Sequence, residues 1–572
     1  MFRLLLYKHT KELITTFSTN RFQPHRGIFY NCALSKKKTS FISKGNKKTD
    51  KASQEVFFPS LRNESIKDKI ALVTGGTEGI GLQCVRKLLT GGAKGVMIAD
   101  TNATKGYDTV MKFSQEFGRN KITFIQIKAA NYVLLKNAFI STINFYKGLD
   151  IVINHVRFQE KNWEDQIDEN IKRVVLSTQL CLEFMGSNYG GNGGILLNIA
   201  SNYDERTISC PLRLAIQDFI VRFDKSVANA HFDSSNIRIL TICKATFDSI
   251  GCDLSTIISK GPNGCVWEPA MALIRPHMLK NLGSLRLFYD KFHLKQNSNH
   301  LSSKSSKHPV SCKVALITGG SVGIGYAFAK SMLQCGLKGV VLGDVREEDG
   351  EKAAEEFNET FGEDRAFFLK CDVTKEGELE NLFECCMDKY QAIDIVINNA
   401  GLLQDKYWSL EIDVNVKGVI HGTLLGFEYM GKHKKGKGGS IVNVASIYGL
   451  QQAHGCPVYN GTKGFVIRFT DAMSNEYYEK LTGVKVFTIC PGVTDTNMID
   501  ESAKYGLQGF GDVGKILSDA LAHLPSQPAE ACGDCLLKML CADQNGSIYV
   551  IEESECYQVK LPDRHSLRVC DD

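Results

Sequence analysis

The chain has 572 residues, 43% of them hydrophobic and 23% charged, which is an ordinary composition for globular protein in a chain too long for one hydrophobic core. The formal net charge of +5 arises in the first 52 residues, which hold 12 Lys and Arg against 2 Asp and Glu, so the remainder carries −5. This balance predicts no basic surface for nucleic acid. No apolar stretch reaches the ~18 residues that a membrane span needs, so we expect none.

The first 65 residues are rich in Ser, Lys and Asn and lack apolar periodicity, which predicts a disordered basic leader over 1–65. Its start is basic and nearly free of acid, as in mitochondrial import signals, but Glu12 interrupts the pattern. We therefore expect a cytoplasmic protein, with mitochondrial import as the alternative.

The 19 cysteines are odd in number and scattered singly, which favours reduced thiols over a disulfide framework. Cys532 and Cys535 have the spacing of a redox or metal motif. No second Cys or His pair completes a metal set, and we expect no metal site.

The chain contains one sequence pattern twice. Thr74–Gly81 matches Thr318–Gly325, and Asp150–Asn154 matches Asp394–Asn398, both at an offset of 244 residues. Solenoid repeats are only about 20–50 residues long, so this period indicates a domain duplication. Two adjacent genes read as one chain are the alternative origin.

The two copies set the expected domain organisation. We predict a first domain over 66–292, a flexible linker rich in Ser, Lys and Asn over 293–311, and a second domain over 312–572.

Each copy opens with a short apolar run, a glycine turn and a helical pattern. In the second copy, Val314–Ile317 is followed by this turn and then by another apolar run, Val340–Leu342. Such alternation indicates a parallel sheet buried on both faces. We predict an α/β fold of two tandem Rossmann-like, doubly wound parallel-sheet domains.

The glycine turn of the second copy, with Gly319, Gly323 and Gly325, follows a strand and opens a helix, which predicts a dinucleotide site with the pyrophosphate at the helix N-terminus. Asp344, 19 residues beyond Gly325, can accept hydrogen bonds from ribose hydroxyls and would repel a 2′-phosphate, so NAD is favoured over NADP. Arg346 could partly offset that repulsion.

Tyr459 and Lys463 lie four residues apart and therefore share one helix face, as a proton-transfer pair requires. The first copy has Arg213 and Gln217 in these places, which cannot replace the pair. We expect a working second copy and a catalytically inactive first copy.

Together the motifs of the second copy resemble the short-chain dehydrogenase/reductase family. The matching motifs are Thr318-Gly-x-x-x-Gly-x-Gly325, Asn398-Asn-Ala-Gly401, Asn415, Ser446, Tyr459-x-x-x-Lys463 and Pro491-Gly-Val-x-Asp-Thr496. Within the family, Gly422–Met430 and the Lys/Gly-rich loop after it are most similar to NAD-dependent 15-hydroxyprostaglandin dehydrogenases and insect-type alcohol dehydrogenases.

This resemblance implies site residues. Tyr459 is the expected acid/base, and Lys463 together with the positive nicotinamide of NAD⁺ lowers the pKa of its phenol. Ser446 holds the substrate oxygen, and Asn415 anchors a water chain to Lys463. The implied cofactor-binding residues are Gly319, Ser321, Gly323, Ile324, Gly325, Asp344, Asp372, Val373, Asn399, Tyr459, Lys463, Pro491, Val493 and Thr496.

The implied reaction is NAD-dependent oxidation of a secondary alcohol, for example a hydroxy fatty acid or a prostaglandin-like molecule, to a ketone. The alternative is a non-catalytic dinucleotide-binding or scaffold protein. Cys456 stands where the prostaglandin enzymes carry glutamine, which weakens prostaglandin specificity. The stretch from Met498 to about Leu524 is the expected lid.

The first copy loses most of the pattern after its glycine turn. His155, Val156 and Arg157 replace Asn399–Gly401, Lys128 replaces Asp372, and Lys244-Ala245 replaces Pro491-Gly492. The helix with Phe219, Ile220, Phe223 and Val227 keeps an apolar face, and relatives pair their subunits through the corresponding helix. We expect either an internal pseudo-dimer or a homo-oligomer.

Overall fold

The computed structural model describes residues 66–128, 131–156, 162–200, 210–243, 254–259, 261–269, 274–277, 308–496, 506 and 513–562. The predicted basic leader and residues 293–307 of the predicted linker lie outside the described residues.

The first copy begins at β1 and is built from strands alternating with helices. Its strands are β1 (Ile70–Thr74), β2 (Gly95–Asp100), β3 (Ile122–Gln126), β4 (Ile151–His155), β5 (Gly194–Ala200), β6 (Ile237–Cys243), β7 (Val266–Pro269) and β8 (Ile274–His277). Its helices are α2 (Gly79–Thr90), α3 (Ala103–Phe117), α4 (Tyr132–Tyr146), α5 (Trp163–Ile167), the π-helix η1 (Asp168–Lys172), α6 (Arg173–Met185), the 3-10 turn η2 (Ser187–Tyr189) and α7 (Pro211–Ser235).

The second copy repeats this order. Its strands are β9 (Val314–Thr318), β10 (Gly339–Asp344), β11 (Ala366–Lys370), β12 (Ile395–Asn398), β13 (Gly439–Val444), β14 (Val484–Pro491), β15 (Ile548–Glu552) and β16 (Glu555–Val559). Its helices are α10 (Gly323–Gln334), α11 (Glu347–Phe361), α12 (Glu376–Tyr390), α13 (Trp408–Ile412), α14 (Val419–Met430), α15 (Pro457–Met473), α16 (Glu476–Thr482), α18 (Val513–Ala522) and α19 (Ala529–Ala542), with short turns η6 (Asp405–Tyr407), η8 (Lys432–Lys434) and η9 (Ile447–Gly449) and the π-helix η7 (Asp413–Gly418).

The strands form two eight-stranded sheets of the same topology. The first runs β3-β2-β1-β4-β5-β6-β7-β8 and the second runs β11-β10-β9-β12-β13-β14-β15-β16, and in each only the last strand pairs antiparallel. The strand order therefore reverses beside β1 and beside β9, where doubly wound folds bind their ligands. The predicted fold of two tandem Rossmann-like domains is confirmed.

Helices cover both faces of each sheet because the strands are apolar on both sides. Every residue of β1 and of β9 is buried. In the second copy, α10, α11 and α19 share one core with the sheet, and α12, α14 and α15 pack on the opposite face. The core on the α12, α14 and α15 face continues into the first copy, where it includes residues of α4, α6 and α7.

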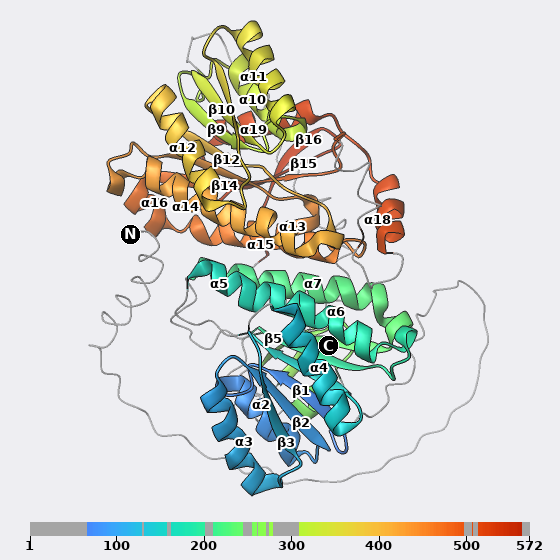
Figure 1. Ribbon diagram of the computed structural model, residues 1–572. Coiled ribbons are helices and arrows are strands. Elements are labelled where there is room, and N and C mark those ends of the chain that lie inside the picture. Colours follow the sequence, from blue (N-terminus) through green and yellow to red (C-terminus); the bar gives the residue numbers. More distant parts are fainter. Residues whose placement is uncertain are drawn as a thin grey trace, which may run out of the picture.

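The two copies meet through α7 and α15, which lie side by side between the sheets (Figure 1). Two glycines of α15 permit the close approach: a Cβ at Gly461 would lie 2.9 Å from the Phe219 ring, and one at Gly464 would lie 2.2 Å from the Arg222 side chain. The Phe219–Phe223 stack in α7 has the same 5.9 Å separation and 18° tilt as a phenylalanine stack in α15.

Two further features concern cysteines and membranes. Cys535 of α19 and Cys556 of β16 form a disulfide, so the expectation of reduced thiols is wrong for this pair. The sequence separates them by 21 residues, and only the folded sheet edge brings them together. Within the described ranges, no helix combines the length and apolar character required to cross a bilayer.

Candidate active site

The glycine turn between β9 and α10 forms the floor of the candidate site. Gly319 and Gly323 have φ values of +64° and +60°, in the left-handed region that favours glycine. A Cβ at Gly325 would lie only 2.1 Å from the Gly319 carbonyl oxygen. Asn399 Nδ2 donates to that same oxygen at 2.7 Å and to the Thr318 carbonyl at 3.1 Å. The turn thus presents bare backbone at the start of a helix, as a pyrophosphate site requires.

Asp344 ends β10 beside this turn and accepts hydrogen bonds from the backbone amides of Ser321 at 3.2 Å and Arg346 at 3.1 Å. Ser321 Oγ is buried and has no partner among the described residues, so a ligand could supply one. Ile324 follows in the first turn of α10.

The late loop after β14 closes over the glycine turn. Pro491 ends β14, and the chain continues through Val493 to Thr496, whose Cγ2 atom lies 3.1 Å from the Cβ position of Gly323. Most of the predicted lid, over 498–505 and 507–512, lies outside the described residues; its C-terminal part includes helix α18.

Asp372 and Val373 follow β11 on the same edge of the sheet. Asp372 accepts hydrogen bonds from the amide and the hydroxyl of Thr374 at 3.0 and 2.7 Å, which fixes its carboxylate. Val373 is nearly buried and packs toward Gly418. Apart from Tyr459 and Lys463 on α15, the twelve other predicted cofactor residues therefore lie at or next to the carboxyl ends of the strands.

The four predicted catalytic residues come from three separate elements. Tyr459 and Lys463 lie one turn apart on α15, and Lys463 Nζ is 5.5 Å from the Tyr459 ring centroid. Lys463 Nζ also donates to the Val444 carbonyl at 3.1 Å. Ser446, just beyond β13, hydrogen-bonds Tyr459 and accepts the Tyr448 amide at 3.2 Å.

Asn415 sits in the π-helix η7, an irregularity often found at functional sites. Its side chain bonds the amide and carbonyl of Leu402 at 2.8 Å each. A Cβ placed on Gly401 would lie 3.3 Å from both Asn415 Oδ1 and Lys463 Nζ. The bare backbone of Gly401 therefore keeps the space between these two polar atoms open, as the predicted water chain requires.

Burial has the largest effect on the pKa values of Tyr459 and Lys463. It raises the pKa of the Tyr459 phenol, and the hydrogen bond from Ser446 lowers that pKa by a smaller amount. Burial also lowers the pKa of Lys463 to about 8, against a smaller raising effect of the Glu411 carboxylate. These side chains alone therefore do not lower the pKa of Tyr459, so the expected lowering depends on the positive nicotinamide as well as on Lys463.

Two buried acids beside the pair escaped sequence reasoning. Asp405 and Glu411 are 2% and 0% exposed, and Asp405 binds the backbone of Tyr459. No motif or periodicity marks either residue, because their proximity depends on the packing of η6 and α13 against α15.

The corresponding region of the first copy differs in its details. Asp100 accepts both the amide and the hydroxyl of Thr77, at 3.1 and 2.7 Å, and is 1% exposed. His155 Nδ1 lies 3.4 Å from the Gly75 carbonyl, in place of the Asn399 contact. Lys128 is exposed. The predicted differences at Arg157, Lys244 and Ala245 lie outside the described residues.

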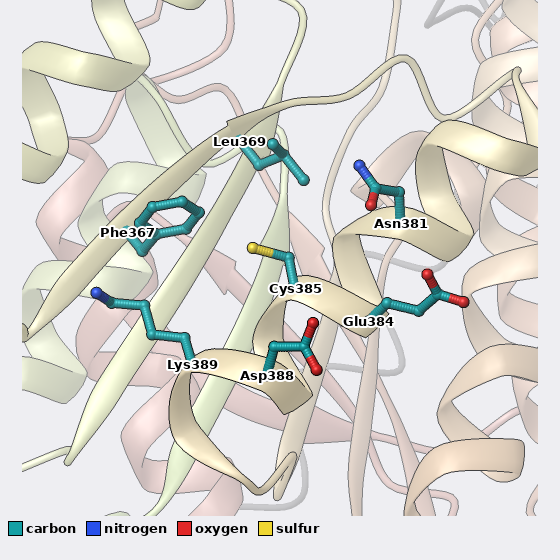
Figure 2. A pocket seen from close by; sticks show the side chains of 7 residues that line it. All are labelled: Phe367, Leu369, Asn381, Glu384, Cys385, Asp388 and Lys389. Carbon is teal, nitrogen blue, oxygen red and sulfur yellow. The ribbon is translucent and has the colours of Figure 1, made fainter.

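A separate cavity of about 460 Å³ lies between β11 and α12 (Figure 2). Seven side chains line it: Phe367, Leu369, Asn381, Glu384, Cys385, Asp388 and Lys389. It contains none of the predicted site residues.

The fold and this constellation define a dinucleotide-binding α/β protein of oxidoreductase type. The model of the short chain dehydrogenase family matches twice, over residues 69–248 and 313–505, and the chain belongs to this family as a tandem duplication.

Two curated relatives each match a stretch of this chain about as long as one copy. The chain is 37% identical over 195 residues to "15-hydroxyprostaglandin dehydrogenase [NAD(+)]" of Mus musculus, covering 34% of this chain and 72% of the relative. It is 31% identical over 253 residues to "Alcohol dehydrogenase 1" of Ceratitis cosyra, covering 44% of this chain and 96% of the relative. Among solved structures, a short chain dehydrogenase/reductase from Burkholderia phymatum in complex with NAD is 21% identical, with a TM-score of 0.37 over 41% of this chain and 87% of that one.

Proposed function

We propose that the second copy is an NAD-dependent dehydrogenase that oxidises a secondary alcohol to a ketone. The observation that carries this proposal is the grouping of Ser446, Tyr459 and Lys463 beside the glycine turn, with Asn415 and Lys463 both facing the space next to Gly401. The names of the relatives, an NAD(+)-dependent prostaglandin dehydrogenase and an alcohol dehydrogenase, support the same reaction class.

The residues present fit NAD. The Gly319 turn would hold the pyrophosphate together with the buried Ser321 hydroxyl, which no described residue pairs with. Asp344 would hold the adenosine ribose, and Asp372 with Val373 the adenine. Lys463 and Thr496 would contact the nicotinamide half. When bound, NAD⁺ supplies a positive charge and accepts a hydride from the alcohol carbon.

The chain's own residues manage the proton. Ser446 holds the alcohol oxygen, and Tyr459 takes the hydroxyl proton as the carbon is oxidised. Lys463 stabilises the phenolate form of Tyr459, and Asn415 holds water next to Lys463 that passes the proton onward. Cys456, which stands where the prostaglandin enzymes carry glutamine, is buried next to Tyr459 at the start of α15. We therefore propose secondary alcohols as the substrate class and assign no prostaglandin.

We further propose that the first copy is a pseudoenzyme whose role is to cover the α15 face, giving one chain the pairing that other members obtain between subunits. The reciprocal contacts of α7 and α15 support this role. So does the hydroxyl of Ser226 in α7, which donates to the Ala453 carbonyl in the loop before α15.

Incubating the full chain with NAD⁺ and a panel of secondary alcohols, and following the absorbance of reduced cofactor, tests the proposal. Turnover with NAD⁺ is expected for at least one long-chain secondary alcohol. Cofactor binding without turnover on any alcohol or ketone would instead favour the non-catalytic dinucleotide-binding protein.

A further inference from the structure

The helix that carries Tyr459 begins on a carboxylate from another element. Asp405 in η6 accepts hydrogen bonds from the backbone amides of Val458 at 2.8 Å and Tyr459 at 3.1 Å. Pro457 occupies the first helical position, so these are the first amides of α15 that lack a partner inside the helix. The carboxylate also faces the positive end of the helix dipole. Asp405 therefore holds the backbone of Tyr459 directly.

Glu411 of α13 is a second carboxyl group beside Asp405, and the mechanism above leaves it unused. Its side chain is fully buried, and neither of its oxygens receives a well-formed hydrogen bond from any described residue. Two adjacent carboxyl groups away from water cannot both be ionised without a large electrostatic penalty. A single proton shared by the two groups removes that penalty, and it turns one of the unpaired Glu411 oxygens into a donor for the Asp405 carboxylate.

The surroundings decide which acid keeps the proton. Burial raises the pKa of Glu411 well above its ordinary range, and the Asp405 carboxylate raises it further; the Gln404 amide and the Lys463 ammonium lower it less. Burial also raises the pKa of Asp405, but the amides of Val458 and Tyr459 stabilise its ionised form. The charge therefore resides on Asp405 and the proton on Glu411.

We propose that Glu411 is a positioning residue: it stays protonated and donates its hydrogen to Asp405, so that the pair carries a single negative charge fixed at the start of the Tyr459 helix. This role rests on the dehydrogenase activity proposed above. Lys463, Tyr459 and Cys456 are the other titratable groups that face the pair. An ionised Glu411 would place a second negative charge near Tyr459, which would raise the pKa of the phenol and slow proton removal from the alcohol.

The first copy offers a natural comparison. In this region the two copies are offset by 245 residues, because Asp168 and Lys172 match Asp413 and Lys417. Gln166 therefore occupies the position of Glu411. Glutamine has nearly the size of glutamic acid and donates through its amide, without a titratable group. Helix α5 of the first copy therefore has a neutral hydrogen-bond donor at the position that Glu411 occupies in α13.

Two substitutions in the full chain distinguish the effect of the donated hydrogen from the effect of the side chain's volume. Glu411→Gln keeps a donor to Asp405, and Glu411→Leu keeps the volume without a donor. With NAD⁺ and an active alcohol, we expect Glu411→Gln to stay within about threefold of the wild-type kcat at neutral pH, and Glu411→Leu to lose about tenfold, the value of one hydrogen bond to a charged group. Loss of the Lys463 proton, whose pKa is about 8, lowers kcat/KM at alkaline pH in every variant. The further decline caused by ionisation of Glu411 should be missing in Glu411→Gln, which should therefore decline less than the wild type. Equal losses in both variants, or an unchanged alkaline decline in Glu411→Gln, would overturn the proposal.

Infrared spectroscopy provides a readout that needs neither turnover nor a stable leucine variant. At neutral pH the wild-type protein should show a carbonyl band of a protonated carboxylic acid that is absent from Glu411→Gln. Identical spectra in this region would overturn the proposal even if the enzyme is active. A wild-type protein that shows the band but oxidises no alcohol would refute the proposed function and leave the proton assignment standing.

Discussion

Lys172 Nζ in the first copy lies 2.7 Å from the Asp413 carboxylate in the second, and Lys417 repeats this contact with Asp168 at 2.7 Å. Each lysine also reaches the aspartate four residues earlier in its own π-helix, at 3.4 and 3.2 Å. Contacts exchanged in this reciprocal way are the mark of an isologous interface, normally made by two identical subunits. Here one polypeptide supplies both sides.

This charge cluster should contribute to the stability of the whole chain. Because the Lys172 side chain is only 10% exposed, Lys172→Met should lower the free energy of unfolding by about 1–2 kcal/mol, as it leaves two aspartates with one cation. Lys434→Met is the matched control: it removes a 2.8 Å pair with Glu428 that is 30% and 46% exposed, and should cost less than about 0.5 kcal/mol. Denaturant unfolding monitored by circular dichroism distinguishes the two, and equal effects would argue against a structural role of the cluster.

Removal of the first copy tests the internal pairing more broadly. A chain of residues 312–572 exposes the apolar face of α15, including the phenylalanines that α7 covers. We expect it to self-associate, and its molar mass by light scattering should rise with concentration. A truncated protein that remains monomeric with the full specific activity of the intact chain would show that the first copy has no pairing role.

The choice between NAD and NADP should depend on the second copy alone. Asp344→Ala removes the carboxylate that would repel a 2′-phosphate, so the ratio of kcat/KM for the two cofactors should move toward NADP by at least about tenfold. Asp100→Ala makes the same change in the first copy and should leave the ratio unchanged. A shift of equal size in both variants would place a working cofactor site in the first copy.

Asp224 should make the first copy sensitive to pH. It is fully buried and accepts hydrogen bonds from Thr241 at 2.6 Å and Asn198 at 2.8 Å, and burial raises its pKa to about 7. The native state therefore keeps a proton that the unfolded chain releases from pH ~4 upward. This stabilisation is complete below pH ~4 and is lost as the pH rises to about 7.

The second copy has Thr470 at the same place, bonded by Asn443 at 2.9 Å. Asp224→Thr should accordingly flatten the fall of melting temperature between about pH 4 and 7. An unchanged profile would show that another group titrates there.

Features of the fold and site that depend on local sequence patterns could be predicted, whereas contacts between distant residues could not. Alternating apolar runs and glycine turns are local signals, and they predicted the two tandem sheets correctly. The same local patterns placed Gly319 and Asp344 at a strand end and Tyr459 and Lys463 on one helix face, and their roles stay predictions. The apolar face containing Phe219 also predicted a pairing surface.

Relationships that depend on tertiary packing were missed. Asp405 and Glu411 lie 54 and 48 residues before Tyr459, and no local pattern links them to it. The Cys535–Cys556 disulfide was not predicted, because the number and spacing of the cysteines favoured reduced thiols; folding brings the two residues together. The spacing of Tyr459 and Lys463 also did not reveal how strongly burial raises the pKa of the Tyr459 phenol.

The most direct test of the account compares Tyr459→Phe with Arg213→Lys, its counterpart in the first copy, in the full chain. With NAD⁺ and an alcohol that the wild type oxidises, Tyr459→Phe should lower kcat by at least about 10²-fold while the Kd for NAD⁺ changes by less than about threefold, because only the transferable proton is removed. Arg213→Lys should retain wild-type kcat. Substantial turnover by Tyr459→Phe, or its loss in Arg213→Lys alone, would contradict a single catalytic centre in the second copy.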